Sequence, residues 1–374
     1  MKPVVAVVSP WDLEDQRAWS GVVRPMVSEM RKHSDLIEFG GLVSQPTIVD
    51  RGLAKAFGKL GRDYLPDISI LTATRNSKSL RDSLSPVAVD AIVSLAGSTF
   101  TLRTPQNVPL LQITDSTFGA LVGFYPLFSN LSMLSEWQGK LIERRNVQHS
   151  DHFLVSSDWA KEQFVNACGV PFEKVTVSPF GAGPATDFSE IDGDSHQTRP
   201  SAGLRVLFVS SDWQRKGGAE VLRIFQRFRG ESPDSTLTIV GDAPIIEQDG
   251  VTSLGRQSSE VLAKWYANSD VLVEATNANA GGMTLTDAAA FGLPVISRNV
   301  GGVGSIVDHG KTGFLIGSEE NFIDRALHFL RILSNSELRT TMGAKAKTHY
   351  DKMLSWSAWG NHYSKTIKGM IENE

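Results

Sequence analysis

Residues 271–296 read Val271-Leu-Val-Glu-Ala-Thr-Asn-Ala-Asn-Ala-Gly-Gly-Met-Thr-Leu-Thr-Asp-Ala-Ala-Ala-Phe-Gly-Leu-Pro-Val-Ile296. The stretch begins with an apolar run at 271–273, continues through a small polar loop at 276–282, and ends in a second apolar run that starts at Pro294. Gly292 and Pro294 form a helix stop signal, because glycine accepts the left-handed cap and proline cannot continue the helical hydrogen bonds. The order predicts a strand, a loop, a short helix and a second strand.

The loop of this stretch has the composition of an anion-binding site. Gly281-Gly282 would bring bare backbone close to a ligand. The helix that starts near Met283-Thr284 would aim free N–H groups and a positive dipole end at the same place, which suits a diphosphate. Asp287 lies about one turn further into the helix, where a carboxylate can bind a pair of hydroxyl groups beside that anion.

Length and composition describe a globular protein with two domains. The chain has 374 residues, of which 41% are hydrophobic and 21% charged, and its net charge of −4 argues against a nucleic-acid binder. Cys168 is the one cysteine and the eight histidines lack metal-ligand spacing, so we expect no disulfide framework and no metal site. The apolar run at 4–8 is far below the roughly 18–20 residues of a membrane span. We expect a cytoplasmic protein, and peripheral contact with the inner face of a membrane stays open.

Strand-like runs alternate with helical segments along the chain. They lie at 4–8, 68–71, 91–95, 109–113, 153–155 and 174–177 in the first half, and at 204–209, 236–240, 251–254, 270–273, 294–297 and 313–316 in the second. This alternation is typical of doubly wound sheets, and the first run is β-branched throughout, as in a strand buried on both faces. The polar, aperiodic residues 184–203 between the two series indicate an interdomain linker.

Polar residues follow several of these strands. Arg215-Lys216 comes after the run at 204–209, and two cations beside a helix N-terminus can hold a diphosphate and stabilise the charge that develops as it leaves. A solvated turn is the alternative for this pair. Ser20-Gly21 is either an anion or hydroxyl contact or an ordinary turn. Asp115 follows the run at 109–113, at the sheet edge where ligands bind in open α/β folds, or it caps a turn.

Several common catalytic motifs are missing from the sequence. It has no Gly-x-Ser-x-Gly elbow, no Walker A loop and no Cys-x-x-Cys pair, which counts against hydrolase, P-loop and thiol-redox functions. The first strand is not followed by Gly-x-Gly-x-x-Gly, which weakens a dehydrogenase interpretation.

A series of motifs runs through the second half of the chain. They are Val206-Leu-Phe-Val-Ser-Ser-Asp-Trp-Gln-Arg-Lys-Gly-Gly218, Thr238-Ile-Val-Gly-Asp242, Leu254-Gly255, Trp265-Tyr-Ala-Asn-Ser-Asp-Val-Leu-Val273, Gly282-Met283, Asp287-Ala-Ala-Ala-Phe-Gly-Leu-Pro-Val-Ile296, Gly301-Gly302 and His309-Gly-Lys-Thr-Gly-Phe-Leu-Ile316. In this order they resemble a bacterial glycosyltransferase of the GT-B fold, in the large retaining family 4. The first half resembles the same group more loosely, at Asp115-Ser-Thr-Phe118, Val155-Ser-Ser-Asp-Trp159 and Val177-Ser-Pro-Phe-Gly181.

The resemblance implies an α/β fold of two Rossmann-like domains that face each other across a cleft. It implies an acceptor domain at 1–185 joined by a C-terminal helix at about 356–374, a linker at 186–203, and a nucleotide-sugar donor domain at 204–355. The implied reaction is a retaining transfer of a sugar from a nucleotide-diphosphate sugar to a glycan, lipid-linked or small acceptor, as in polysaccharide biosynthesis. We expect no metal or other cofactor, because cations and dipoles already supply the countercharge.

The resemblance also assigns roles to single residues. In the family a lysine at the place of Lys216 and a basic partner hold the donor diphosphate, and Arg215 is the expected partner because the family's earlier arginine falls on Ser211. Two family glutamates fall on Asn279 and Asp287. At these positions the resemblance implies that Asp287 keeps the charged contact to the ribose with a shorter side chain. Asn279 keeps the hydrogen bond to the transferred sugar but lacks the negative charge. The implied reaction residues are Arg215, Lys216 and Asp115, and the implied donor-binding residues are Ser20, Gly21, Ser211, Asn279, Gly281, Gly282, Met283, Thr284 and Asp287.

Two further residues, Asp115 and Glu274, affect what the resemblance implies about the site. Asp115 stands where the family often has a histidine, which alters another contact to the sugar. Glu274 is a spare carboxylate near the site, and its position at a strand end suggests a structural role first. Because of Asn279 and Ser211, a pseudoenzyme or assembly partner that binds nucleotide sugar without turnover stays open as an alternative. A GT-B-fold epimerase is a separate alternative among enzymes.

Overall fold

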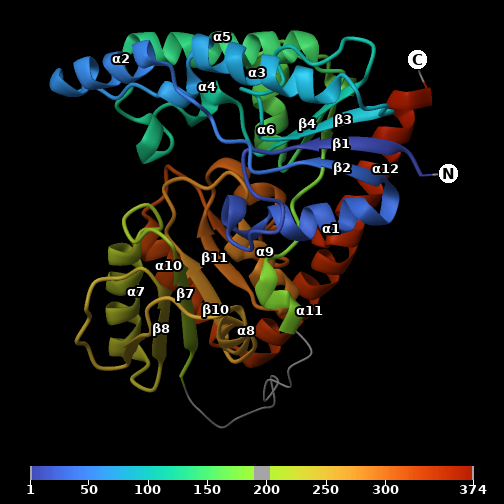
Figure 1. Ribbon diagram of the computed structural model, residues 1–374. Helices are drawn as coiled ribbons and strands as arrows, with labels where there is room; N and C mark the ends of the chain where they lie inside the picture. The colour runs from blue at the N-terminus through green and yellow to red at the C-terminus, as the bar shows by residue number, and fades with distance from the viewer. Residues whose placement is uncertain (1, 189–202, 373–374) are drawn as a thin grey trace. The chain divides into compact units, whose positions relative to one another are not determined.

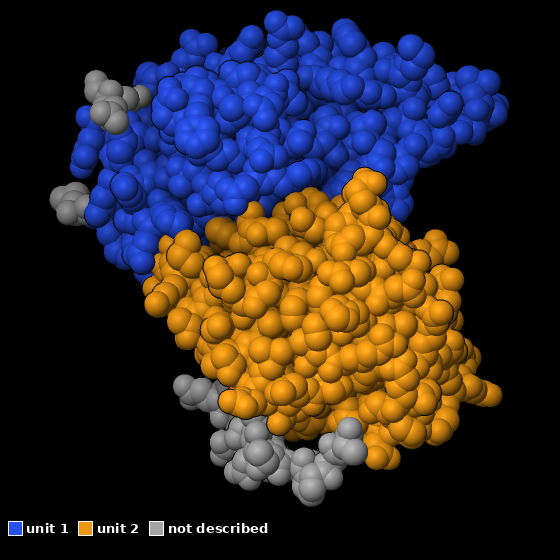
Figure 2. Space-filling model, turned by 180° about the vertical axis from the view of Figure 1, so that it is seen from behind, with its two compact units in different colours: residues 1–178, 359–374 blue, residues 179–358 orange. Residues whose placement is uncertain are grey.

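A computed structural model describes residues 2–188 and 203–372 of the chain, which form two compact units (Figure 1; Figure 2). Unit 1 comprises residues 1–178 and 359–374, and unit 2 comprises residues 179–358. Most of the predicted linker, 189–202, lies outside the described residues. Each unit contains a six-stranded sheet with helices, which confirms the expected α/β class. Among the described helices, none is long and apolar enough to cross a lipid bilayer.

Unit 1 has a parallel sheet with the strand order β2-β1-β3-β4-β5-β6. Its strands are β1 (Val4–Val8), β2 (Asp35–Phe39), β3 (Ala91–Leu95), β4 (Leu110–Thr114), β5 (His152–Val155) and β6 (Val175–Val177). Its helices include α1 (Val23–His33), α2 (Ile48–Lys59), α3 (Ile70–Leu84), α4 (Phe118–Leu121), α5 (Met133–His149) and α6 (Asp158–Glu162). The strand order reverses between β1 and β3, so the loops after these two strands diverge at that point.

Unit 2 has a parallel sheet with the strand order β12-β11-β10-β7-β8-β9. Its strands are β7 (Arg205–Ser210), β8 (Thr236–Gly241), β9 (Val251–Ser253), β10 (Val271–Glu274), β11 (Val295–Arg298) and β12 (Gly313–Ile316). Its helices are α7 (Gly218–Glu231), α8 (Ser259–Ala267), α9 (Met283–Ala290), α10 (Phe322–Leu333) and α11 (Ser336–His349). Here the order reverses between β7 and β10, which makes their carboxyl ends the expected ligand site of this sheet.

The core of unit 2 explains why its strands appear in the sequence as continuous runs of apolar residues. Phe208 and Val271 point to one face of the sheet, where they pack with side chains of α7 and α10. Leu207 and Leu272, their neighbours in the chain, point to the other face and pack with α8 and α9 (Figure 1). Side chains alternate across a strand, so a sheet covered by helices on both faces needs apolar residues at every position.

The strand predicted at 68–71 is wrong. Pro66–Ile68 form a 3-10 turn, and the Ser69 hydroxyl accepts a hydrogen bond from the backbone N–H of Thr72 at 3.0 Å, which begins α3. A serine that caps a helix satisfies a backbone donor, and this outweighs a short β-branched pattern. Strand β2 was not predicted, because Asp35 and Glu38 interrupt the apolar run of this edge strand.

The last helix, α12 (Trp356–Glu372), contributes to unit 1 from Trp359 onward. Within that unit the hydroxyl of Tyr363 lies 2.9 Å from the hydroxyl of Ser34, at the end of α1. Gly360 permits the close approach of the two helices, because a Cβ atom there would lie 2.5 Å from Glu29 Oε1. Helix α12 therefore packs beside α1, as Figure 1 also shows.

Candidate functional site

The loops after β7 and β10 meet at the carboxyl edge of the unit 2 sheet. The two strands are neighbours in the sheet, and the backbone N–H of Asn277 donates to the carbonyl of Arg215 at 2.8 Å. Gly217 makes the approach possible: its φ is +71°, and a Cβ atom there would lie 2.2 Å from the carbonyl oxygen of Ala275. A side chain at this position would push the loops apart, so the site depends on glycine.

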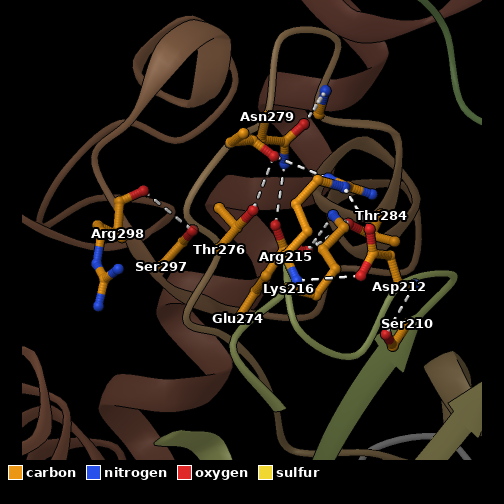
Figure 3. A network of polar contacts seen from close by, with 12 residues as sticks. Ser210, Asp212, Arg215, Lys216, Glu274, Thr276, Asn279, Thr284, Ser297 and Arg298 are labelled. Atoms are coloured by element: carbon orange, nitrogen blue, oxygen red, sulfur yellow. Dashed lines mark hydrogen bonds and ion pairs between the residues drawn. The ribbon is translucent and has the colours of Figure 1, made fainter. Parts of the chain in front are cut away.

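A buried carboxylate, Glu274 at the end of β10, connects the two loops (Figure 3). Lys216 Nζ donates to Glu274 Oε2 at 2.8 Å, and the hydroxyl of Thr284 donates to the same oxygen at 2.7 Å. Asn279 Nδ2 donates to Glu274 Oε1 at 2.9 Å. The side chains of Lys216 and Glu274 are only 7% and 1% exposed. Three donors therefore satisfy the carboxylate and hold the Lys216 ammonium at the N-terminus of α9.

The amide of Asn279 is engaged at both ends. Its Oδ1 atom accepts the backbone N–H of Gly282 at 2.8 Å, while its Nδ2 atom binds Glu274. Gly282 is the N-cap residue of α9 with φ of +64°, and α9 has no side-chain cap bond there. Asn279 thus joins the strand end to the start of the helix, and its side chain has a fixed orientation.

Arg215 lies beside this network on the loop after β7. Its guanidinium donates to the carbonyl of Ala278 at 2.8 Å and lies 3.5 Å from the Asp212 carboxylate. Burial lowers the pKa of Lys216 below its ordinary value, Glu274 opposes this, and the nearby charge of Arg215 adds to the lowering. An ammonium has three N–H donors, of which Glu274 and Thr284 take two. Together with the first N–H groups of α9, these donors have the charge and hydrogen-bonding character that a phosphoryl group requires.

Asp287 lies one turn further along α9 and is 7% exposed. Its Oδ1 atom accepts the backbone N–H of Gly183 at 2.6 Å. Burial raises the pKa of Asp287 to about 7, although the bond from Gly183 works in the opposite direction. A buried carboxylate of this kind is stabilised by further hydroxyl donors.

The remaining predicted residues fall into two groups. In unit 2, Gly281 and Met283 flank Gly282 at the start of α9, while Ser211 is exposed on the loop after β7. In unit 1, the predicted residues are Ser20, Gly21 and Asp115. They lie on loops that follow β1 and β4, and Asp115 accepts a hydrogen bond from the side chain of Trp19.

Glu274 has a larger part in the site than the sequence indicated. Its strand-end position suggested a structural role, and the structure agrees, because it accepts hydrogen bonds from two of the predicted donor-binding residues and from the predicted lysine. The available signal was an acidic residue at the last position of an apolar, buried strand, because a buried charge requires a partner. Within the described ranges, no group of three or more His, Cys, Asp or Glu side chains is arranged for a metal ion. The expectation of metal-free chemistry stays a prediction.

Comparison with known proteins identifies a family domain in unit 2. Residues 203–332 match the family model of Glycosyl transferases group 1. The N-acetyl-alpha-D-glucosaminyl L-malate synthase of Bacillus anthracis is 29% identical over 155 residues, covering 38% of this chain and 39% of that protein. The D-inositol 3-phosphate glycosyltransferase of Pseudarthrobacter chlorophenolicus is 25% identical over 222 residues, covering 54% of this chain and 52% of the other. The matches thus span less than two thirds of either relative.

Solved structures share the fold over the whole chain. The sucrose-phosphate synthase of Thermosynechococcus elongatus superposes with a TM-score of 0.70 at 16% identity, covering all of both chains. The Anabaena protein HepE, solved with UDP and glucose, superposes with a TM-score of 0.60 at 13% identity, covering 98% of this chain and 100% of the other. These likenesses confirm two Rossmann-like domains of the GT-B type.

Proposed function

We propose that this chain transfers a sugar from a nucleotide-diphosphate sugar to an acceptor hydroxyl, with retention at the anomeric carbon; the Glycosyl transferases group 1 match in unit 2 and the similar glycosyltransferases support this. In this proposal unit 2 holds the donor and unit 1 holds the acceptor. The named activities of the curated relatives and the UDP and glucose bound to HepE support a nucleotide-sugar donor.

The observation that carries the proposal is the position of Lys216. Its ammonium is buried at the N-terminus of α9, 2.8 Å from Glu274 Oε2, with Arg215 on the same loop. A lysine is rarely buried without a function or a charged partner, and here the partner leaves one N–H group for a ligand. Cation, helix dipole and backbone donors together match a diphosphate.

The chemistry follows from this placement. The donor diphosphate binds at the start of α9, with Arg215 and Lys216 against its oxygen atoms. When the bond from the anomeric carbon to the phosphate oxygen breaks, these groups stabilise the charge that develops on the leaving diphosphate. The acceptor hydroxyl attacks the anomeric carbon from the face that the diphosphate leaves, and its proton passes to the departing phosphate oxygen. Asp287 binds the ribose hydroxyl groups of the same donor.

The test is nucleotide binding followed by turnover. Calorimetry with UDP, GDP and ADP identifies the base, and release of the diphosphate from the matching nucleotide sugars measures donor turnover. Lys216→Ala should weaken diphosphate binding and slow turnover by roughly 10- to 1000-fold, as for the loss of one group that stabilises the transition state. Lys264→Ala is the matched control, because this lysine of α8 is exposed and pairs with Glu260, one helical turn away. Equal activity of the two variants would contradict the assignment.

One observation favours a second candidate, which is nucleotide-sugar binding without turnover. Asn279 takes the place of a family glutamate, and both ends of its amide bind the protein itself. A side chain engaged in this way offers less to a transferred sugar than a carboxylate would. Tight nucleotide binding with no turnover across a broad acceptor panel would support this candidate over the transferase.

A further inference from the structure

We propose that unit 2 has a second ligand site, a cavity between helix α11 and the turn 308–312, which binds the phosphate group of a small, soluble phosphate monoester. The cavity has a volume of about 610 Å³, which is the size of many small-molecule sites. None of its lining residues belongs to the proposed donor site. The inference therefore goes beyond the proposed function and does not depend on it.

The cavity lies at the edge of the unit 2 sheet that is opposite to the donor loops. The turn 308–312 directly precedes β12, and the strands of this sheet are parallel, so the turn is at the amino edge. Lys216 and the start of α9 follow the carboxyl ends of β7 and β10. A ligand in the cavity is therefore a different molecule from the donor.

One face of α11 forms the longer wall of the cavity. Its lining residues recur at intervals of three or four positions, which is the spacing of side chains on one face of a helix. Ala344 has the shortest side chain of this face and lies one turn from both Thr340 and Thr348, so it leaves a hollow between them. The wall consists of Thr340, Thr341, Ala344, Lys345, Thr348 and His349, continued by Lys352 and Met353, and the facing wall consists of Asp308, Lys311 and Thr312.

The helical segment changes its hydrogen bonding where it reaches the end of the cavity. Residues Tyr350–Leu354, directly after α11, form a π-helical turn that carries Lys352 and Met353. A regular α-helix would turn these two side chains to a different angle about the axis. Turns of this kind are rare and occur frequently at functional sites, which agrees with a ligand site here.

The two walls are held in place by contacts outside the cavity. The opposite face of α11 buries Met342, and Gly343 packs directly on the end of α9, since a Cβ atom on Gly343 would lie 2.3 Å from the carbonyl oxygen of Gly292. His349, near the end of the wall, forms a hydrogen bond with the backbone of Ile306, just before the facing turn. Helix and turn are thus fixed to the same core, and the cavity is preformed.

The side chains that line the cavity carry an excess of positive charge. Lys311, Lys345 and Lys352 face it from both walls, and Asp308 is the carboxylate among the lining residues. Asp308 Oδ2 lies 2.9 Å from Lys311 Nζ, so these two charges compensate each other. Within the part of the chain that the structure describes, Lys345 and Lys352 form no ion pair. Two ammonium groups are therefore left for an anion.

The other titratable groups nearby do not change this balance. Burial lowers the pKa of His349 below its ordinary value, although Asp308 opposes the shift, so the ring carries no charge at pH 7. Lys347 and Asp351, which lie outside the lining, pair with each other at 3.0 Å. The net charge of the cavity at neutral pH is thus positive, which favours an anionic ligand.

The types of donor in the cavity determine the class of anion. A planar carboxylate is matched best by the fork of an arginine, and the lining residues include no arginine. Lysine ammonium groups and threonine hydroxyl groups instead donate from several directions, as the tetrahedral oxygens of a phosphate require. Ala344 and Met353 add apolar surface for the organic part of the ligand. A phosphate monoester has both of these parts.

The test follows the methyl signals of the methionines in the full chain by NMR. Met353 lines the cavity and Met283 begins α9, so their signals report separately on the cavity and on the proposed donor site. Phenyl phosphate and glycerol 3-phosphate are the ligands, and phenol and glycerol are their uncharged counterparts. We expect at least one ester to shift the Met353 signal saturably and to bind at least about tenfold more tightly than its counterpart.

Variants separate the charge of the cavity from its shape. The Lys345→Ala/Lys352→Ala double variant should weaken ester binding at least about tenfold, because hydrogen bonds to charged groups are lost. Lys347→Ala is the matched control, since Lys347 lies on the same helix and pairs with Asp351. Ala344→Leu fills the hollow without changing the charge and should abolish the ester-induced shift of Met353. Its Tm should stay unchanged, because Ala344 is exposed.

Three results would overturn the proposal: no saturable shift of Met353 with either ester, equal binding of the esters and their uncharged counterparts, or equal affinity of the double variant and Lys347→Ala. Binding to phosphatidylglycerol vesicles without binding of a soluble ester would also overturn it, because the lysines would then contact a membrane surface. Lys216→Ala separates this proposal from the proposed function. It should reduce the nucleotide-induced shift of Met283 and leave the ester-induced shift of Met353 unchanged.

Discussion

Lys216 Nζ and Glu274 Oε2 lie 2.8 Å apart, in a pair whose side chains are 7% and 1% exposed. The two residues come from different loops of one sheet edge, and the bond between them fixes both loops. Glu274 also receives hydrogen bonds from Asn279 and Thr284, so one carboxylate organises the start of α9. The order of the proposed donor site therefore depends on the contacts that this acid makes with Lys216, Asn279 and Thr284.

Removing the charge of Glu274 should cost stability. Glu274→Gln leaves the Lys216 ammonium buried without a countercharge, which lowers the free energy of unfolding by about 3–5 kcal/mol. Urea denaturation measures the change. Glu231→Gln is the control, because Glu231 forms an exposed pair with Arg331 and should shift the transition little. A Lys216→Met/Glu274→Leu double variant should be more stable than Glu274→Leu alone, and the reverse order would contradict the ion-pair account.

Asp287 should make stability depend on pH. Its pKa is raised to about 7 in the folded protein, above that of an ordinary aspartate, so the folded state holds the proton more tightly. Stability then falls as pH rises from about 4 to about 7, because the unfolded state has already released the proton. Asp287→Asn has no proton to lose, so its Tm should exceed that of the wild type at pH 8 and approach it at pH 4. Parallel Tm profiles for the two proteins would rule out this titration.

Asp287 should also contribute to nucleotide affinity. Asp287→Ala removes the carboxylate that accepts the Gly183 N–H and is proposed to bind the ribose. Losing a charged hydrogen-bond acceptor should weaken binding of the nucleoside diphosphate by roughly 10-fold or more. The corresponding 2′,3′-dideoxynucleotide should lose little affinity in this variant. Intact affinity for the normal nucleotide would count against a ribose contact.

Restoring the family glutamate should not improve the site. Asn279 Nδ2 lies 2.9 Å from Glu274 Oε1, so Asn279→Glu places two carboxyl groups within hydrogen-bonding distance. One of them must then hold a proton at neutral pH, and stability should fall as pH rises above the ordinary range of glutamate. Adding Glu274→Gln removes the repulsion and should recover part of the lost stability. Melting curves across pH measure both effects, and a fully stable single variant at pH 8 would be the contrary result.

Gly217 should tolerate no side chain. It combines a φ of +71° with a Cβ position 2.2 Å from a carbonyl oxygen, whereas Gly255 has a similar φ of +64° in open space. Gly255→Ala should cost only the strain of a left-handed residue, about 1–2 kcal/mol. Gly217→Ala adds the steric clash, so it should cost more and also weaken nucleotide binding by moving Lys216. Equal costs for the two substitutions would show that the contact with Ala275 is not limiting.

Much of the fold follows from local sequence. Runs of apolar residues, each followed by a glycine or polar loop, predicted eleven of the strands in unit 1 and unit 2 close to their observed bounds. The start of α9 after Gly282 and the stop before Gly292 were also predicted, because glycine at these positions has a local backbone cause. The two errors, a strand predicted at 68–71 and the missed strand β2, also had local causes. Ser69 caps a helix inside an apolar run, and β2 is an edge strand whose acidic residues hide its pattern.

Sequence alone determined the class of fold, the loops that bear the site and the residues Arg215, Lys216 and Asp287 as candidates, because strand pattern and glycine placement are local properties. The tertiary structure decided which residues these candidates contact. Lys216 meets Glu274 across 58 positions of the chain, and Asp287 meets Gly183 across 104. Such pairs depend on which strands become neighbours and which side chains are buried together. A buried charge needs a hydrogen-bonding or oppositely charged partner, because an unpaired charge in the protein interior is strongly unfavourable.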